Sequence, residues 1–232
     1  MEKAAAVYDQ ADTDPDPDRP LVIAFPSGFY PEDSWQDDLE FAGSELALSA
    51  RELGDDREGD WTAGAARWAR AYLDSEVKGT LNVADVSAPT HVDLATALDG
   101  DRGNGVGAAD LYKDLRRQLE DGVERAGHDP FGAGAVYDDF DAVPHTFGLV
   151  AAAQLYAKAT GDTRFAAFAG RQRGWALGAD PWGTSFVIGA GEVCPHCPEH
   201  QLATCAAAST ARARSCGARW STAPTRLTTS PT

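Results

Sequence analysis

The stretch that decides the fold is SWQDDLEFAGSELALSARELGDDREGDWTAGAARWARAYLD, residues 34–74. Apolar residues recur in it every three or four positions, which predicts two amphipathic helices joined by a short charged loop. We expect the first helix to be capped by Ser34 and to run to about Arg51, and the second to be capped by Asp60. The predicted buried positions are Leu39, Ala42, Leu46 and Ser49/Ala50 in the first helix, and Trp61, Ala65, Trp68, Ala69 and Tyr72 in the second.

The same alternation of helix and loop continues on both sides of this stretch. Residues 2–11 are typical of the last turns of a helix, and residues 21–35, LVIAFPSGFYPEDSW, of a strand or an extended loop. With about six helices and no run of alternating strands, the sequence predicts an all-α protein. Further helices are expected at Pro89–Leu98, at Ala108–Ala126 with Leu111, Leu115, Leu119 and Val123 buried, at Pro144–Thr160 ending in Gly161, and at Thr163–Leu177 with Gly178 as the C-cap.

Composition excludes several classes of protein. The chain has 232 residues, of which 43% are hydrophobic and 24% charged, so it can bury a sizeable core. Its formal net charge of −16 argues against nucleic acid as a partner, because nucleic-acid binders present a basic face. No apolar run approaches the roughly 20 residues of a membrane-spanning helix, so a membrane is not expected as a partner. The N-terminus lacks the apolar core of a signal peptide, and localisation stays open.

The charge changes abruptly near the C-terminus. All 36 acidic residues lie before residue 202, and residues 202–232 contain four Arg in an Ala/Ser/Thr-rich sequence. We expect a domain over residues 1–203 and a tail over 204–232 that is disordered or encoded in a shifted reading frame. The shifted frame is favoured over a genuine divergent tail.

Four segments, taken in order, resemble a known family. They are residues 28–39, GFYPEDSWQDDL; residues 79–94, with DVS and HVDL; residues 161–178, with GD and WALG; and residues 178–200, with GADPWGTSFVIGAG followed by PHCPEH. Together they closely resemble the C-terminal half of glycoside hydrolase family 9, the cellulase family of endoglucanases. The resemblance implies an (α/α)6 barrel, of which about half of the twelve helices are present, with a cleft at one end for a β-1,4-glucan chain.

The family hydrolyses glycosidic bonds with inversion, using one carboxylate as a base on water and one Glu as an acid on the leaving oxygen. In relatives the base lies in an Asp-Ala-Gly-Asp motif upstream of the matched region, and the acid lies in an Asn-Glu pair downstream of it. This chain has no such Asp-rich motif and no Glu after Glu199. No catalytic residue can therefore be transferred, and the resemblance implies a chain that is truncated at both ends relative to the family. Asp37 and Asp38 are poor substitutes, because a helix N-terminus favours their ionised forms.

Four residues are candidates for substrate binding. By the resemblance, His200 and Gln201 occupy positions where the family contacts glucan. Trp182 and Tyr30 lie in Gly/Pro-containing loops, where flat rings could stack on pyranose faces. The alternatives are an exposed loop His and aromatic rings that pack in the core, and packing is the favoured reading for Trp35.

The cysteines raise the question of a metal. Cys194, His196, Cys197, His200 and Cys205 have a zinc-like C-x-x-C spacing, but a second separated pair of ligands is lacking. A Cys194–Cys197 disulfide and free thiols remain alternatives. Asp14, Asp16 and Asp18 lack EF-hand spacing and are typical of a solvated acidic loop. We therefore assign no metal and no cofactor.

The sequence predicts an endo-β-1,4-glucanase-like glycoside hydrolase of polysaccharide catabolism, with a cellulose-like β-glucan as partner, that is inactive as this fragment. A non-catalytic glucan-binding or structural barrel fragment is the alternative. A helical domain with a structural zinc is a third hypothesis.

Overall fold

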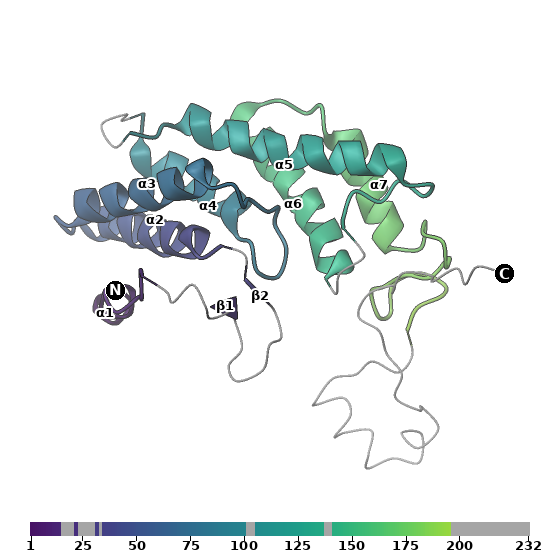
Figure 1. Cartoon of the computed structure of the whole chain (residues 1–232), viewed down its shortest axis with the longest axis horizontal. Helices are drawn as coiled ribbons and strands as arrows, with labels where there is room; N and C mark the ends of the chain where they lie inside the picture. The colour runs from purple at the N-terminus through teal and green to yellow at the C-terminus, as the bar shows by residue number, and fades with distance from the viewer. Residues whose placement is uncertain (15–20, 23–30, 33, 101–104, 137–140, 196–232) are drawn as a thin grey trace, which may run out of the picture.

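The computed structural model describes residues 1–14, 21–22, 31–32, 34–100, 105–136 and 141–195. Helices dominate this part of the chain (Figure 1). A short antiparallel ladder pairs β1 with β2 and is the only regular sheet among the described residues. The elements are α1 (Glu2–Tyr8), β1 (Leu21–Val22), β2 (Pro31–Glu32), α2 (Gln36–Leu53), α3 (Glu58–Asp74), α4 (Ser87–Leu98), α5 (Ala108–His128), α6 (Ala142–Thr160) and α7 (Ala166–Ala176).

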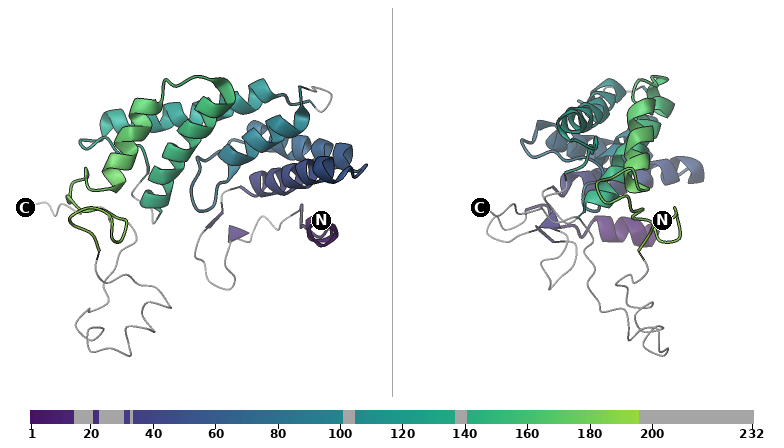
Figure 2. Two further views of the ribbon diagram at one scale, coloured as in Figure 1. Left: turned by 180° about the vertical axis from the view of Figure 1, so that it is seen from behind. Right: turned by 90° about the vertical axis from the view of Figure 1, so that its right-hand side faces the viewer.

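Six of the helices form three consecutive hairpins. α2 packs on α3, α4 on α5, and α6 on α7, while α4 also contacts both α2 and α6. Helices α2, α4 and α6 therefore form one row, and α3, α5 and α7 lie against that row, as Figures 1 and 2 show from three directions. Three hairpins are half of the six in an (α/α)6 barrel, so the structure agrees with the expected partial barrel.

Small residues bring the helices close together. A Cβ added to Gly43 of α2 would lie 3.1 Å from the Cβ of Ala65 in α3, tighter than ordinary contact. The predicted stripe of α3 is confirmed, because Trp61, Ala65, Ala69 and Tyr72 are buried and Trp68 is half-buried. In α5 the three predicted leucines are buried. Val123 is not, because 39% of it is exposed.

Several predicted helix ends are wrong. Trp35 rather than Ser34 precedes α2, and Ser34 donates its hydroxyl to Gln36 instead of capping the helix. α3 begins at Glu58, so Asp60 lies within its first turn. Leu177 rather than Gly178 is the C-cap of α7. Gly161, with φ 76°, ends α6 as predicted, since a left-handed residue at this position costs glycine little.

Two helices begin earlier than the sequence predicts, each before a proline that was expected to be its first residue. α4 begins at Ser87 and α6 at Ala142, each two residues before the proline that we expected to start the helix. Proline is tolerated there because the first N–H groups of a helix have no intrahelical partner. Across the described ranges, none of the helices is both long and apolar enough to cross a membrane.

The loop between α3 and α4, residues 75–86, is packed tightly against α6. A Cβ on Gly148 would overlap the carbonyl oxygen of Leu81, so only glycine allows this approach. Arg117 of α5 donates to the carbonyl of Gly79 at 2.9 Å, and Thr80 contacts His145 of α6. The loop is thus fixed by the helices on either side of it.

Candidate functional site

One end of the helical layer carries the residues of interest. α2, α4 and α6 begin there and α3, α5 and α7 end there, because each hairpin is antiparallel. We call this end the loop face and define it by residues 75–86, 129–136 and 177–195 with the first turns of α2, α4 and α6. In Figure 1 the loop before α4, the start of α6 and the segment after α7 lie on the lower side of the helices, and the loop after α5 lies at the right.

Trp182 lies on the loop after α7, and 46% of its surface is exposed. Asp180 orders the turn, because its Oδ1 accepts the N–H of Trp182 at 2.8 Å and that of Thr184 at 3.5 Å. The loop then turns back on itself, since Ser185 donates its N–H to the carbonyl of Val193 at 2.9 Å. The exposed ring is therefore held on an ordered loop.

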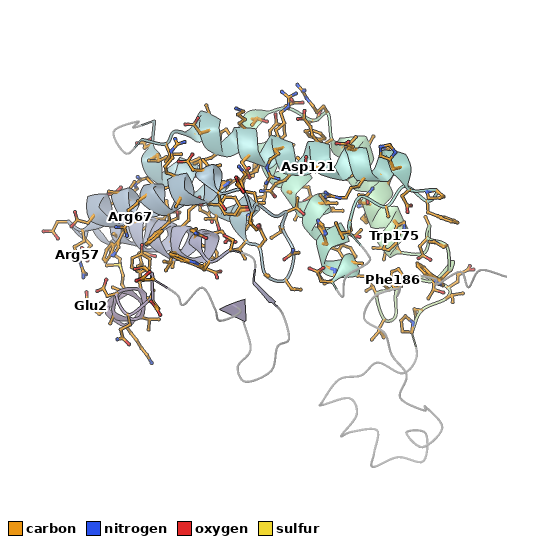
Figure 3. All side chains as sticks on the ribbon, in the orientation of Figure 1. Glu2, Arg57, Arg67, Asp121, Trp175 and Phe186 are labelled. Atoms are coloured by element: carbon orange, nitrogen blue, oxygen red, sulfur yellow. The ribbon has the colours of Figure 1, made fainter. Side chains whose placement is uncertain are left out.

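The ring of Trp182 is the outer member of a stack of three aromatic rings. Its centroid lies 6.1 Å from that of Phe186 in an edge arrangement. Phe186 in turn lies 5.4 Å from the buried Trp175 of α7, and Figure 3 shows these two labelled residues side by side. The stack supports Trp182 from the protein interior and leaves part of its ring open to solvent.

Three carboxyl groups gather where α2 meets the loop before α4. Asp37 is fully buried, and its Oδ2 accepts the N–H of Val86 at 2.8 Å. Asp85 is buried beside it, and Asp38 is exposed on the next position of α2. Burial first, and the charge of Asp85 second, raise the pKa of Asp37 to about 7.

This finding corrects the expectation that the helix N-terminus keeps Asp37 ionised. For Asp37 and Asp38 alike, burial and the nearby Asp85 raise the pKa. A helix dipole is worth about 0.3–1 kcal/mol at an exposed site. Desolvation of a fully buried carboxylate such as that of Asp37 costs more than that. Burial therefore outweighs the helix dipole and raises the pKa.

A charged cluster lies deeper, between α2, α4 and α5. Nδ1 of His91 is 2.7 Å from Oε1 of Glu40, and its Nε2 is 3.5 Å from Oδ2 of Asp114. Burial alone lowers the pKa of His91, but the two carboxylates outweigh it and raise the pKa to about 10. Arg117 closes the cluster by donating from Nε to Asp114 at 2.7 Å. His91 is therefore an imidazolium that ties three helices together.

Neutral side chains connect this cluster to the carboxyls of the loop face. Gln118 donates from Nε2 to Asp114 at 3.0 Å and to the hydroxyl of Ser87 at 2.9 Å. Ser87 and Tyr72 donate their hydroxyls to the two oxygens of Asp85 at 2.6 and 2.9 Å. A continuous buried polar network thus runs from α5 to the loop before α4.

A second buried histidine fixes the neighbouring loop. His145 of α6 accepts the N–H of Val136 on Nδ1 at 3.3 Å, while its Nε2 faces Thr80. Burial first, and then the charge of Arg125, lower its pKa to about 4. A neutral imidazole therefore joins residues 75–86 to residues 129–136.

The structure describes only one of the four predicted substrate-binding residues. Trp182 is on the loop face, whereas Tyr30, His200 and Gln201 lie outside the described residues. Trp35 packs edge-on against Trp68 with centroids 5.1 Å apart, as predicted.

For the zinc hypothesis the structure describes Cys194 alone. It is half-buried as a free thiol and accepts the N–H of Gly189 at 3.4 Å. Within the described ranges no group of three or more His, Cys, Asp or Glu side chains could hold a metal ion. The domain boundary at residue 203 also lies outside the described residues and stays a prediction.

The sequence analysis does not identify the buried polar network as a site. Asp37, Glu40 and Ser44 follow one another at helical spacing on a buried face of α2, which is the available signal. His91 and Asp85 belong to segments that carry the family resemblance, yet neither was assigned a role.

Comparisons with known proteins agree with this architecture. The solved structure described as "structure of AaCel9A in complex with cellobiose-like isofagomine" matches with a TM-score of 0.57 and 22% sequence identity. The match covers 78% of this chain and 33% of that one, so the chain spans about a third of that structure's length. No curated protein matches. The family model for glycosyl hydrolase family 9 matches residues 1–226, nearly the whole sequence, and the chain therefore belongs to glycoside hydrolase family 9.

Proposed function

We propose that this chain is the glucan-contacting part of an endo-β-1,4-glucanase-like glycoside hydrolase, and that Trp182 provides an aromatic platform for a sugar ring. The observation that carries the proposal is the half-exposed ring of Trp182 on its stack with Phe186 and Trp175. The apolar C–H face of a pyranose fits a flat aromatic surface. A ring that is already ordered loses little conformational entropy when it binds.

Family membership supports the class of substrate, a cellulose-like β-glucan. By the family resemblance, His200 and Gln201 supply hydrogen bonds to sugar hydroxyls. Tyr30, in a loop with Gly and Pro, supplies a second stacking surface. These three residues extend the proposed site beyond the one described aromatic residue.

Hydrolysis by inversion needs a base and an acid in different environments. The chain lacks both family motifs that carry these carboxylates. We propose that the fragment binds glucan without cleaving it. Two carboxyls of the loop face, Asp37 and Asp85, support this view, because they are buried and engaged with the protein itself.

A direct test is the binding of cellohexaose to the purified chain by isothermal titration calorimetry. Stacking predicts that Trp182→Ala weakens binding by about tenfold, or about 1.4 kcal/mol. Leu53→Ala is the matched control, because Leu53 is 69% exposed but lies in the last turn of α2, away from the loop face. Equal affinity of wild type and Trp182→Ala would exclude this ring as the platform.

A second candidate is a structural barrel fragment that does not bind sugar. The tight packing of residues 75–86 on α6 favours a scaffold role for part of the loop face. Absence of cellohexaose and cellulose binding by the folded wild-type chain would favour this candidate over the first.

A further inference from the structure

Asp37 joins the first turn of α2 to the loop before α4 through a buried contact. Its Oδ2 accepts the N–H of Val86 at 2.8 Å, and its Oδ1 is buried with no hydrogen-bond partner among the described residues. The N–H of Val86 and the hydroxyl of Ser34 favour the carboxylate form, but the loss of hydration on burial and the charge of Asp85 outweigh them. The neutral acid avoids that cost and still accepts the hydrogen bond from Val86.

The charged groups around Asp37 make ionisation harder. Asp38 lies next to it on α2, and Asp85 faces it from the loop before α4. The cations of the neighbourhood are engaged elsewhere, because His91 of α4 pairs with Glu40 and Arg117 of α5 pairs with Asp114. Among the described residues Tyr72 of α3 also reaches this region, where it donates its hydroxyl to Asp85.

We propose that Asp37 is a proton-dependent latch between α2 and the loop before α4. While Asp37 holds its proton, the contact with Val86 joins the loop to α2. When Asp37 ionises, repulsion from the buried Asp85 opens the contact, although the N–H of Val86 by itself favours the carboxylate. The other end of the loop stays fixed, because Arg117 holds Gly79 and His145 contacts Thr80. The latch therefore moves the segment around Val86 and leaves residues 79–80 in place.

The pH range of the latch follows from its buried position. Burial and Asp85 raise the pKa of Asp37 from its ordinary 3.8 to about 7. Between these values the folded protein holds a proton that the unfolded chain has lost, so this group's contribution to stability falls as pH rises from about 4 through 7 and is level above. Between pH 5 and pH 8 the folding equilibrium constant falls by about a hundred-fold from this group.

Asp37→Asn tests the proposal, because the amide cannot ionise and its oxygen can still accept from Val86. Urea unfolding of the full chain is measured at pH 5 and pH 8 for the wild type, for Asp37→Asn and for the control Glu52→Gln, which changes an exposed carboxylate elsewhere on α2. We expect the folding equilibrium constant of the wild type to fall about a hundred-fold over this interval relative to that of Asp37→Asn, with the control close to wild type. Parallel pH profiles of wild type and Asp37→Asn would overturn the proposal.

Amide hydrogen exchange separates the latch from a general loss of stability. After correction for intrinsic exchange, the Val86 amide of the wild type is expected to lose protection between pH 5 and pH 8, while it stays protected in Asp37→Asn. Buried amides within α5, such as that of Leu115, should lose no more protection in the wild type than the fall in global stability measured by urea, and Val86 should lose more than that. Uniform loss over Val86 and Leu115 would show that the contact does not open locally, and would also overturn the proposal.

Discussion

His91 and Glu40 form a buried ion pair, with Nδ1 and Oε1 2.7 Å apart and neither side chain exposed to solvent. The pair connects α4 to α2, and Asp114 extends it to α5. The junction of three helices therefore depends on charges that have no access to water. Its stability must respond to loss of either partner and to pH.

Glu40→Leu is expected to lower the free energy of unfolding by about 3–5 kcal/mol, because it leaves a buried imidazolium with one carboxylate in place of two. Urea unfolding monitored by circular dichroism measures the loss. Glu52→Leu is the control, since Glu52 is an exposed carboxylate on the same helix and its removal should change stability by less than about 0.5 kcal/mol. A similar effect of both changes would show that the pair with His91 contributes nothing specific.

The same pair predicts a loss of stability at alkaline pH. The pKa of His91 is raised to about 10 in the folded protein, so its contribution is fully present below its ordinary 6.5 and is lost as pH rises through 10. Between pH 7 and pH 10 the slope from this group is about 1.4 kcal/mol per pH unit. Unfolding of His91→Gln over the same range should lack that slope, and an unchanged slope would contradict the assignment of His91 as a cation.

Gly148→Ala is expected to destabilise the protein by about 2 kcal/mol or more, because the new Cβ meets the backbone carbonyl of Leu81. Gly170→Ala is the matched change in α7, where nothing lies within 4 Å of the added Cβ. There the substitution should stabilise the helix by about 0.5–1 kcal/mol. Thermal unfolding of the two variants should therefore shift in opposite directions, and equal shifts would refute the close approach.

The purified chain is expected to release no reducing sugar from carboxymethyl cellulose above a heat-treated control. Each missing proton-transfer group costs about 10²–10⁴-fold in rate, and both family motifs are absent. Sugar release that Asp38→Asn abolishes would instead assign a catalytic role to the exposed carboxyl of Asp38.

The helices could be predicted because most of their burial is apolar and periodic. The stripe from Trp61 to Tyr72 in α3 and the leucines of α5 show the pattern directly. α2 shows its limit. Leu39 and Ala42 were expected on the buried face and are only half-buried, whereas Asp37 and Glu40 are fully buried. A polar residue contributes nothing to hydrophobic periodicity, so its burial depends on partners that other helices supply.

The candidate site could be predicted only in part for a related reason. Trp182 stands out in the sequence because it lies in a loop with Gly and Pro. The network of Glu40, His91 and Asp114 joins residues 51 and 23 positions apart, and local spacing carries no record of such contacts. Helix ends such as that at Ser34 were also misplaced, because several residues near the start of α2 could have served as the cap.

The close contact between the backbone carbonyl of Leu81 and Gly148 also limits how the protein can be engineered. Residues 79–86 contact all four helices α2, α3, α5 and α6, through Val86, Asp85, Gly79 and Leu81 respectively. An inserted residue would displace at least one of these anchors, so the segment behaves as a spacer of fixed length. Foreign peptides or reporter labels are better placed in the turn at residues 54–57, at the opposite end of the α2–α3 hairpin, where Gly54 has open space around it.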